Sequence, residues 1–134
     1  MSAKKETDDA IEVDDHTLVM ATWNTPYIVK NGAVKAYKKI YCETKNGQSG
    51  AIAELLIPRG AIIDHEFGTN MFKTTVYQIT DIKVADDTEY TAYTKCYSIY
   101  DNKFEYKKDK RYYAKIVPGL WFYTNRRAAE KYMM

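Results

Sequence analysis

Apolar and polar residues alternate along most of this chain, in short runs separated by turn-forming residues. Asn31-Gly32 predicts a hairpin, and Pro58-Arg59-Gly60 predicts a sharp stop, because proline cannot donate to a ladder and glycine permits positive φ. β-Branched and aromatic residues favour pleated segments. The pattern predicts strands over residues 18–23, 27–30, 33–42, 51–57, 72–84, 89–100, 104–106, 112–116 and 120–123.

One segment, close to the C-terminus, has helical spacing. Thr124 can accept a hydrogen bond from an amide of the first turn, and Ala128, Ala129 and Tyr132 follow at helical intervals. We therefore expect a mainly β fold of the α+β class, with a small antiparallel sheet, twisted or barrel-like, and a short C-terminal helix. Residues 1–17 are expected to form a flexible acidic arm, and residues 18–134 a single β-rich domain.

The distribution of charge along the chain supports a separate N-terminal arm. Residues 1–16 hold six acids against two lysines, so the rest of the chain carries an excess of basic residues although the net charge is +2. Like charges in a short polar tail repel and extend it. The arm is expected to stay solvated, to fold back on the basic C-terminal part, or to reach a basic neighbour.

The length of 134 residues suits one domain, and 46% hydrophobic residues suffice for a packed core. No apolar run approaches the roughly 20 residues that span a bilayer, and the start of the chain is not typical of a secretory signal. Cys42 and Cys96 form no CxxC pair, and with His16 and His65 they give no zinc-ligand spacing. We expect reduced, buried cysteines in an intracellular setting, with no metal and no cofactor.

Thirteen tyrosines are the most unusual feature of the composition. They exceed what one core face of a sheet needs, so we expect some of them to contact other molecules. A strand-to-helix corner near the C-terminus concentrates aromatic residues. The candidate binding residues are Tyr100, Asp101, Tyr106, Trp121 and Tyr123.

A second candidate is a basic contact patch. Lysines and arginine interleaved with tyrosines could bind a nucleic-acid strand through phosphate contacts and base stacking. The modest net charge and the lack of an RNA-recognition signature favour an acidic protein partner instead. The patch comprises Lys107, Lys108, Lys110, Arg111, Arg126 and Arg127.

Catalytic motifs are absent from the sequence. His65 could act as a general base, but no serine or cysteine stands at a recognisable nucleophile motif near it, so a loop histidine is the simpler interpretation. The glycines form neither a dinucleotide-binding nor a phosphate-binding motif. We therefore expect a protein that is not an enzyme.

Four segments, taken in order, resemble an uncharacterised domain family of large DNA viruses and phages that often follows pentapeptide repeats. The resemblance covers about residues 26–132 and is carried by 36–39, 55–61, 98–106 and the corner from Pro118 to Tyr132. Family members usually carry a Cys-Arg pair near residues 70–73, a cysteine near Ile116 and a histidine near Trp121, all of which this chain lacks. The resemblance therefore implies a viral fold kept for binding.

The same corner is also similar to the nicotinamide-side motif of ADP-ribosyltransferase-like domains. The early histidine or arginine and the late acid of those enzymes have no counterpart that can be assigned here.

These observations together predict a non-enzymatic viral structural or interaction protein, a minor capsid or cement component, in the virion or the host cytoplasm. Its expected partners are other capsid or virion proteins. The alternatives are a soluble viral effector that binds a host protein or a nucleotide, and a degenerate ADP-ribosyltransferase-like domain.

Overall fold

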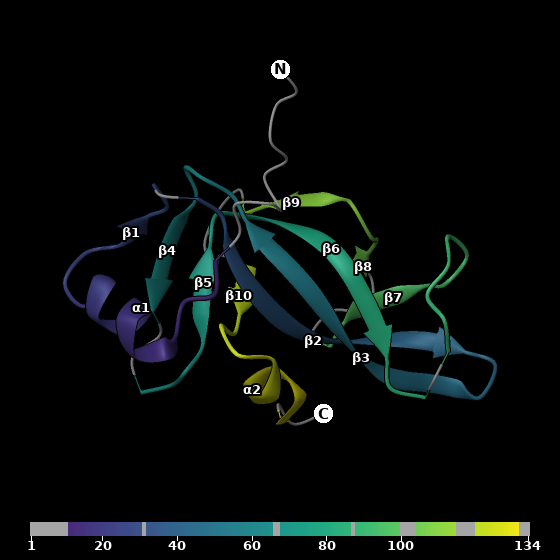
Figure 1. Ribbon diagram of the computed structural model, residues 1–134. Coiled ribbons are helices and arrows are strands. Elements are labelled where there is room, and N and C mark those ends of the chain that lie inside the picture. Colours follow the sequence, from purple (N-terminus) through teal and green to yellow (C-terminus); the bar gives the residue numbers. More distant parts are fainter. Residues whose placement is uncertain are drawn as a thin grey trace, which may run out of the picture.

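The computed structural model describes residues 11–30, 32–65, 68–86, 88–99, 104–114 and 120–131. These residues form two antiparallel sheets and two short helices (Figure 1). The expected mainly β fold with a short C-terminal helix is confirmed, with two sheets in place of one. Neither sheet closes into a barrel over the described strands.

The larger sheet has six strands in the order β8-β7-β2-β3-β6-β9. Its centre is the long hairpin of β2 (Val34–Thr44) and β3 (Gly47–Ile57), which are paired along their full length. Gly47 has a φ of 106°, a conformation that other residues rarely adopt, and it closes the turn of this hairpin. The remaining strands are β6 (Val76–Val84), β7 (Cys96–Ser98), β8 (Glu105–Tyr106) and β9 (Arg111–Tyr113).

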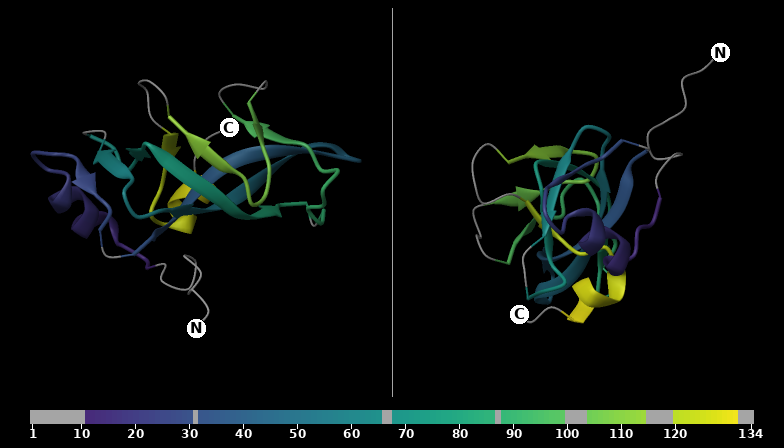
Figure 2. Two further views of the ribbon diagram at one scale, coloured as in Figure 1. Left: turned by 90° about the horizontal axis from the view of Figure 1, so that it is seen from above. Right: turned by 90° about the vertical axis from the view of Figure 1, so that its left-hand side faces the viewer.

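The smaller sheet has the order β1-β4-β5-β10 and lies at one end of the elongated molecule (Figures 1 and 2). Its strands are β1 (Tyr27–Ile28), β4 (Ile62–His65), β5 (Phe72–Thr74) and β10 (Leu120–Phe122). A bridge between Tyr37 of β2 and Tyr123 links the two sheets, with each amide 2.8 Å from the other residue's carbonyl oxygen. The C-terminal strand therefore lies beside the centre of the larger sheet.

One core cluster takes side chains from both sheets and from the first helix, α1 (Asp15–Ala21). On β2, alternate residues starting at Val34 and ending at Cys42 face this core. β3 is buried on both faces in its middle, because Ile52 packs against Ala129 of the second helix, α2 (Arg126–Lys131). α2 thus covers the face of the large sheet opposite the main core.

Four predicted elements differ from the structure. The strand predicted over 72–84 is divided into β5 of the smaller sheet and β6 of the larger sheet. Residues 15–21 form a helix where a strand was predicted over 18–23, since the Asp14 carboxylate accepts from the Thr17 amide and caps the first turn. The predicted hairpin at Asn31-Gly32 does not form, because β1 pairs with β4 and β2 with β3. Of the predicted strand over 89–100, only Cys96–Ser98 is paired as a strand.

The prediction of reduced cysteines is wrong. Cys42 of β2 and Cys96 of β7 are directly opposite each other across the ladder, with Cα atoms 4.0 Å apart, and they form a disulfide. Strand pairing places the two side chains on one face at bonding distance, a relationship that a separation of 54 residues conceals in the sequence.

Residues 1–10 of the predicted arm lie outside the described residues. The part that follows them packs on the domain: Ile11 forms a backbone bridge with Val34, and the Tyr37 hydroxyl donates to Glu12 at 3.4 Å. The Thr124 hydroxyl donates to the Asp15 carboxylate. Acidic residues at this end therefore contact the C-terminal corner.

Candidate functional site

The aromatic corner is built by β10 and the turn into α2. Phe122 is buried and stacks on Phe72 of β5, with ring centroids 5.8 Å apart. Tyr123 packs with Ile52 and Ala129 beneath α2. Trp121 remains partly exposed, and the Lys73 ammonium lies 5.6 Å from the centre of its ring. The corner therefore presents the indole of Trp121 to solvent.

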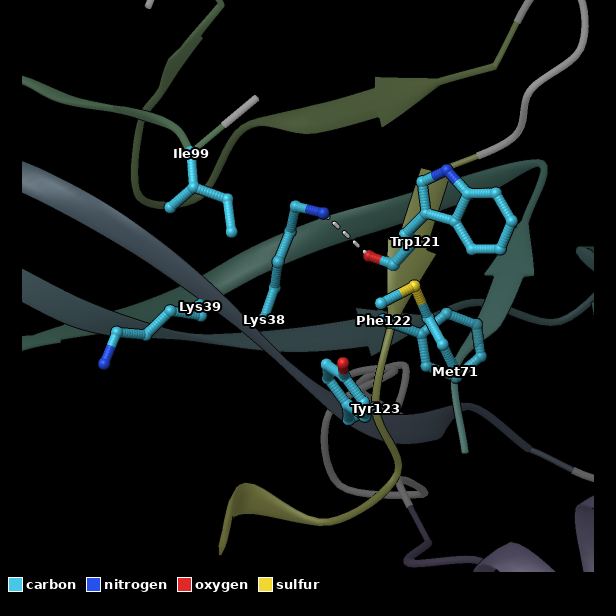
Figure 3. A pocket seen from close by; sticks show the side chains of 7 residues that line it. All are labelled: Lys38, Lys39, Met71, Ile99, Trp121, Phe122 and Tyr123. Atoms are coloured by element: carbon cyan, nitrogen blue, oxygen red, sulfur yellow. Dashed lines mark hydrogen bonds between the residues drawn. The ribbon is translucent and has the colours of Figure 1, made fainter. Parts of the chain in front are cut away.

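Lys38 brings a charge to this corner from the core-facing side of β2. Its side chain is 7% exposed, and its ammonium donates a 3.0 Å hydrogen bond to the Trp121 carbonyl oxygen (Figure 3). Burial lowers the pKa of Lys38 to about 8, since an apolar environment disfavours the charged form. This hydrogen bond thus joins the larger sheet to the smaller one, and it is made by a lysine whose pKa is lowered by burial.

A small hollow surrounds this hydrogen bond. It leaves about 10 Å³ for water centres, close to the need of one water molecule. Figure 3 shows the Lys38 amine directed at the Trp121 carbonyl and the Lys39 amine directed away from it. The lining residues are Lys38, Lys39, Met71, Ile99, Trp121, Phe122 and Tyr123.

Of the predicted binding residues, Trp121 and Tyr123 meet at this hollow. Tyr100 and Asp101 lie outside the described residues. Tyr106 is elsewhere, on β8, and is only 3% exposed. The structure therefore brings together two of the five candidates and places a third in the core.

Tyr106 belongs to a cluster of aromatic residues between β6, β8 and β9. The Tyr77 hydroxyl donates to the Tyr106 hydroxyl at 3.2 Å, and the Tyr106 and Tyr112 rings meet edge to face at 5.3 Å. Burial is the main reason that the pKa of Tyr106 rises to about 12 and that of Tyr77 well above its usual value. These tyrosines fill the core, so the expectation that surplus tyrosines face partners does not apply to them.

The predicted basic patch consists of two separate groups. Lys107, Lys108, Lys110 and Arg111 lie around the turn from β8 to β9, and Arg126 and Arg127 lie on α2, well apart from it (Figure 1). Lys107 pairs with Glu105 at 3.5 Å, and the Lys108 ammonium is 3.9 Å from the Asp81 carboxylate. Arg111 donates to Gln78 at 3.4 Å. Carboxylates thus lie beside Lys107 and Lys108, whereas Arg111 is bound to a neutral amide.

Arg126 lies beside a polar cleft between the N-terminal segment and α2. It pairs with Glu130 at 2.9 Å. Tyr37 contributes its hydroxyl to the cleft, and burial, followed by the charge of Glu12, raises the pKa of that hydroxyl. The cleft is lined by Glu12, Val13, Asp14, Asp15, Tyr37, Thr124, Asn125 and Arg126.

His65 lies at the end of β4 rather than in a loop. Its Nε2 is 2.7 Å from the Thr69 carbonyl oxygen, and its ring packs on Phe72 with centroids 4.8 Å apart. Across the described ranges, no group of three or more His, Cys, Asp or Glu side chains converges to hold a metal ion. In the same residues, no helix has the length and apolar character needed to cross a bilayer.

Comparison with known families identifies the chain. Residues 24–129 match a family of unknown function, DUF5758. The chain belongs to this family. The predicted resemblance to an uncharacterised domain family is confirmed to that extent. No curated protein and no solved structure matches it.

In this DUF5758 chain, sequence reasoning missed the residue with the most unusual environment at the corner. Lys38 shares its parity on β2 with Val34, Ala36, Ile40 and Cys42, all of them buried. Side chains alternate between the two faces of a strand, so a lysine at every-second spacing with apolar residues is expected to lie on the buried face. This spacing was the signal in the sequence that could have identified Lys38.

Proposed function

We propose that the protein is a non-enzymatic interaction module that binds another protein subunit and serves as a minor capsid or cement component of a large DNA virus. The observation that carries the proposal is that four large apolar side chains, from α1, the residues just after it, β1 and β4, are exposed: Met20, Trp23, Ile28 and Ile62. We call these four residues the apolar end.

The apolar end combines a helix with a sheet edge. Ile28 of β1 and Ile62 of β4 are directly opposite each other, 48% and 42% exposed. Met20 on α1 and Trp23 just after it are 61% and 56% exposed, at the same end of the molecule (Figure 1). Methionine and tryptophan are enriched at protein interfaces, and clustered exposed apolar side chains are typical of contact surfaces.

The nature of the assembly rests on the sequence resemblance to a family of large DNA viruses and phages. A particle subunit needs a stable shape and a surface that excludes water on contact, and it needs no reactive groups. The edge strand β1 adds a second means of contact, since an unpaired strand edge can hydrogen-bond to a neighbour.

The proposal is tested by incorporation into purified particles of the source virus. Trp23→Glu and Ile62→Lys place charges in the apolar end and should reduce the copy number per particle, measured by quantitative mass spectrometry. Tyr93→Glu is the matched control, because Tyr93 is 93% exposed and lies in the turn before β7, outside the apolar end. Its copy number should stay unchanged.

Two outcomes would overturn the proposal. Absence of the wild-type protein from particles, with abundance in infected cells, would favour the soluble effector. Equal incorporation of all three variants would remove the apolar end as the contact surface.

A further inference from the structure

Residues 88–99, which we call the strap, lead from β6 toward β8 and contain one short strand, β7. The buried residues of the strap are Cys96 and Ser98, both on β7, and the rest of the strap is exposed or half-buried. β7 lies toward the end of the molecule opposite α1 and β1 (Figure 1). The burial of the strap is therefore concentrated in a strand of three residues.

Few backbone pairs hold β7 in the larger sheet. It pairs with β2 at three positions and with β8 at two. At the borders of these ladders, the Glu43 amide donates to the Lys95 carbonyl oxygen at 2.8 Å, and the Ser98 amide donates to the Phe104 carbonyl oxygen at 3.0 Å. Short segments with few hydrogen bonds open at lower free energy than long central strands. β7 is thus weakly attached by its backbone pairing.

The part of the strap before β7 adds one contact with the domain and one turn. Tyr90 packs against the core, and its hydroxyl accepts from the Lys108 amide at 3.1 Å. In the turn that follows, the Thr91 amide donates to the Thr94 hydroxyl at 2.9 Å, and the Thr94 amide donates to the Thr91 carbonyl oxygen at 3.1 Å. These bonds are internal to the turn, so they do not hold the strap on the sheet.

The disulfide adds a covalent constraint where the noncovalent ones are few. Cys96, the first residue of β7, is bonded to Cys42 directly opposite it on β2. While the bond is intact, β7 cannot separate from β2 at this position. Once the bond is broken, only the short ladders and the packing of the buried residues keep β7 in place.

We propose that the Cys42–Cys96 disulfide is a redox-sensitive latch, which a dithiol reductant opens to release β7 from the edge of β2. A thiolate of the reductant attacks one sulfur and forms a mixed disulfide, and its second thiol completes the exchange. The bond between Cys42 and Cys96 breaks, the two cysteines gain two electrons and two protons, and the dithiol is oxidised to a disulfide. Both cysteines are buried, so the attack follows a transient opening of β7 and is slow.

The latch gives the protein two states that depend on its surroundings. Disulfides persist in oxidising compartments and are reduced in the cytosol. Release of β7 leaves β2 without its partner at Ile40, Tyr41 and Cys42, and an unpaired strand edge can pair with another chain. This inference does not depend on the subunit contact proposed for the apolar end.

Hydrogen exchange of the folded protein, measured by NMR with and without dithiothreitol, tests the latch. The amides of Glu43 and Ser98 should exchange on the order of 100-fold faster after reduction, an effect typical of a disulfide. The Tyr37 amide is the internal control, because it lies on the same strand as Glu43 but donates to Tyr123, away from β7. Its exchange should change much less. Alkylation and mass spectrometry should count two thiols after reduction and none before.

A variant shows whether dithiothreitol acts through this bond. Cys42→Ala/Cys96→Ala should exchange rapidly at Glu43 and Ser98 and should not respond to dithiothreitol. The wild-type measurement is sufficient if this variant does not fold. Three results would overturn the proposal: a bond that resists dithiothreitol in the folded protein, unchanged exchange at Glu43 and Ser98 after reduction, or equal acceleration at Tyr37.

Discussion

Cys42 and Cys96 face each other across the β2–β7 ladder and are joined by a disulfide. β7 pairs with β2 at three positions and carries β8 on its other side. The disulfide therefore fastens one edge of the six-stranded sheet to its central hairpin.

Removing this bond should destabilise the fold. A disulfide that closes a loop of 54 residues restricts the unfolded chain and is worth about 4 kcal/mol in the chain-entropy description. Urea unfolding of the Cys42→Ala/Cys96→Ala double variant should show this loss, and a dithiol reductant should lower the stability of the wild type alone. Two reactive thiols in unreduced, denatured protein would contradict the prediction.

Lys38 should make stability rise with pH between about 8 and 10. Its pKa is about 8 in the folded protein against 10.5 ordinarily, so in this range the unfolded chain binds more protons. The difference corresponds to about 3 kcal/mol at pH 7. In urea unfolding, the stability of Lys38→Met relative to the wild type should fall as pH rises from 7 to 10. A pH-independent difference would show that folding does not lower the pKa of Lys38.

Tyr106 should make the stability of the fold decrease as pH rises above about 10. Its pKa is raised to about 12 from 10.0, so above pH 10 the folded protein holds the proton that the unfolded chain releases, and stability falls. Thermal unfolding between pH 9 and 11 should show a shallower decline in Tyr106→Phe than in the wild type. Tyr93→Phe, at a 93% exposed position, should decline as the wild type does.

Removing the hydroxyl of Tyr112 should destabilise the fold more than removing that of its neighbour Tyr113. The Tyr112 hydroxyl accepts from the Lys107 amide at 2.7 Å and donates to the Glu105 carbonyl oxygen at 3.1 Å, which closes the turn between β8 and β9. Tyr112→Phe should cost about 1 kcal/mol in urea unfolding, from the loss of these bonds. Tyr113→Phe, at a 63% exposed position, should cost nothing measurable. Equal effects would mean that the hydroxyl does not hold the turn.

Local sequence patterns were sufficient to predict secondary structure where a segment follows one periodicity. β2 follows strict alternation, β3 is an apolar run bounded by turn residues, and the C-terminal helix has its own spacing, so all three were predictable. The predicted cap of that helix is wrong: the Asn125 side chain, not Thr124, accepts from the Arg127 and Ala128 amides. Residues 18–23 were not, because a short apolar run suits a strand and a helix equally well. There the Asp14 cap and burial of Leu18 decide the outcome.

The site was harder to predict because it depends on pairs that are distant in sequence. Trp121 and Tyr123 were predicted from their local motif. Their approach to Lys38 depends on the Tyr37–Tyr123 bridge, which only the tertiary fold creates. The same applies to the disulfide, where the strand register, not the spacing, brings the sulfur atoms together.

The contact between Asp15 and Thr124 has a consequence for biosynthesis. The two residues are separated by 109 positions, so a growing chain cannot form this contact until nearly all of these residues have left the ribosome. The helix that begins at Asp15 is made early, yet its partner is made late. The contact between Asp15 and Thr124 therefore belongs to the final stage of folding after synthesis, whereas the bridge between Ile11 and Val34 joins residues that are both made early.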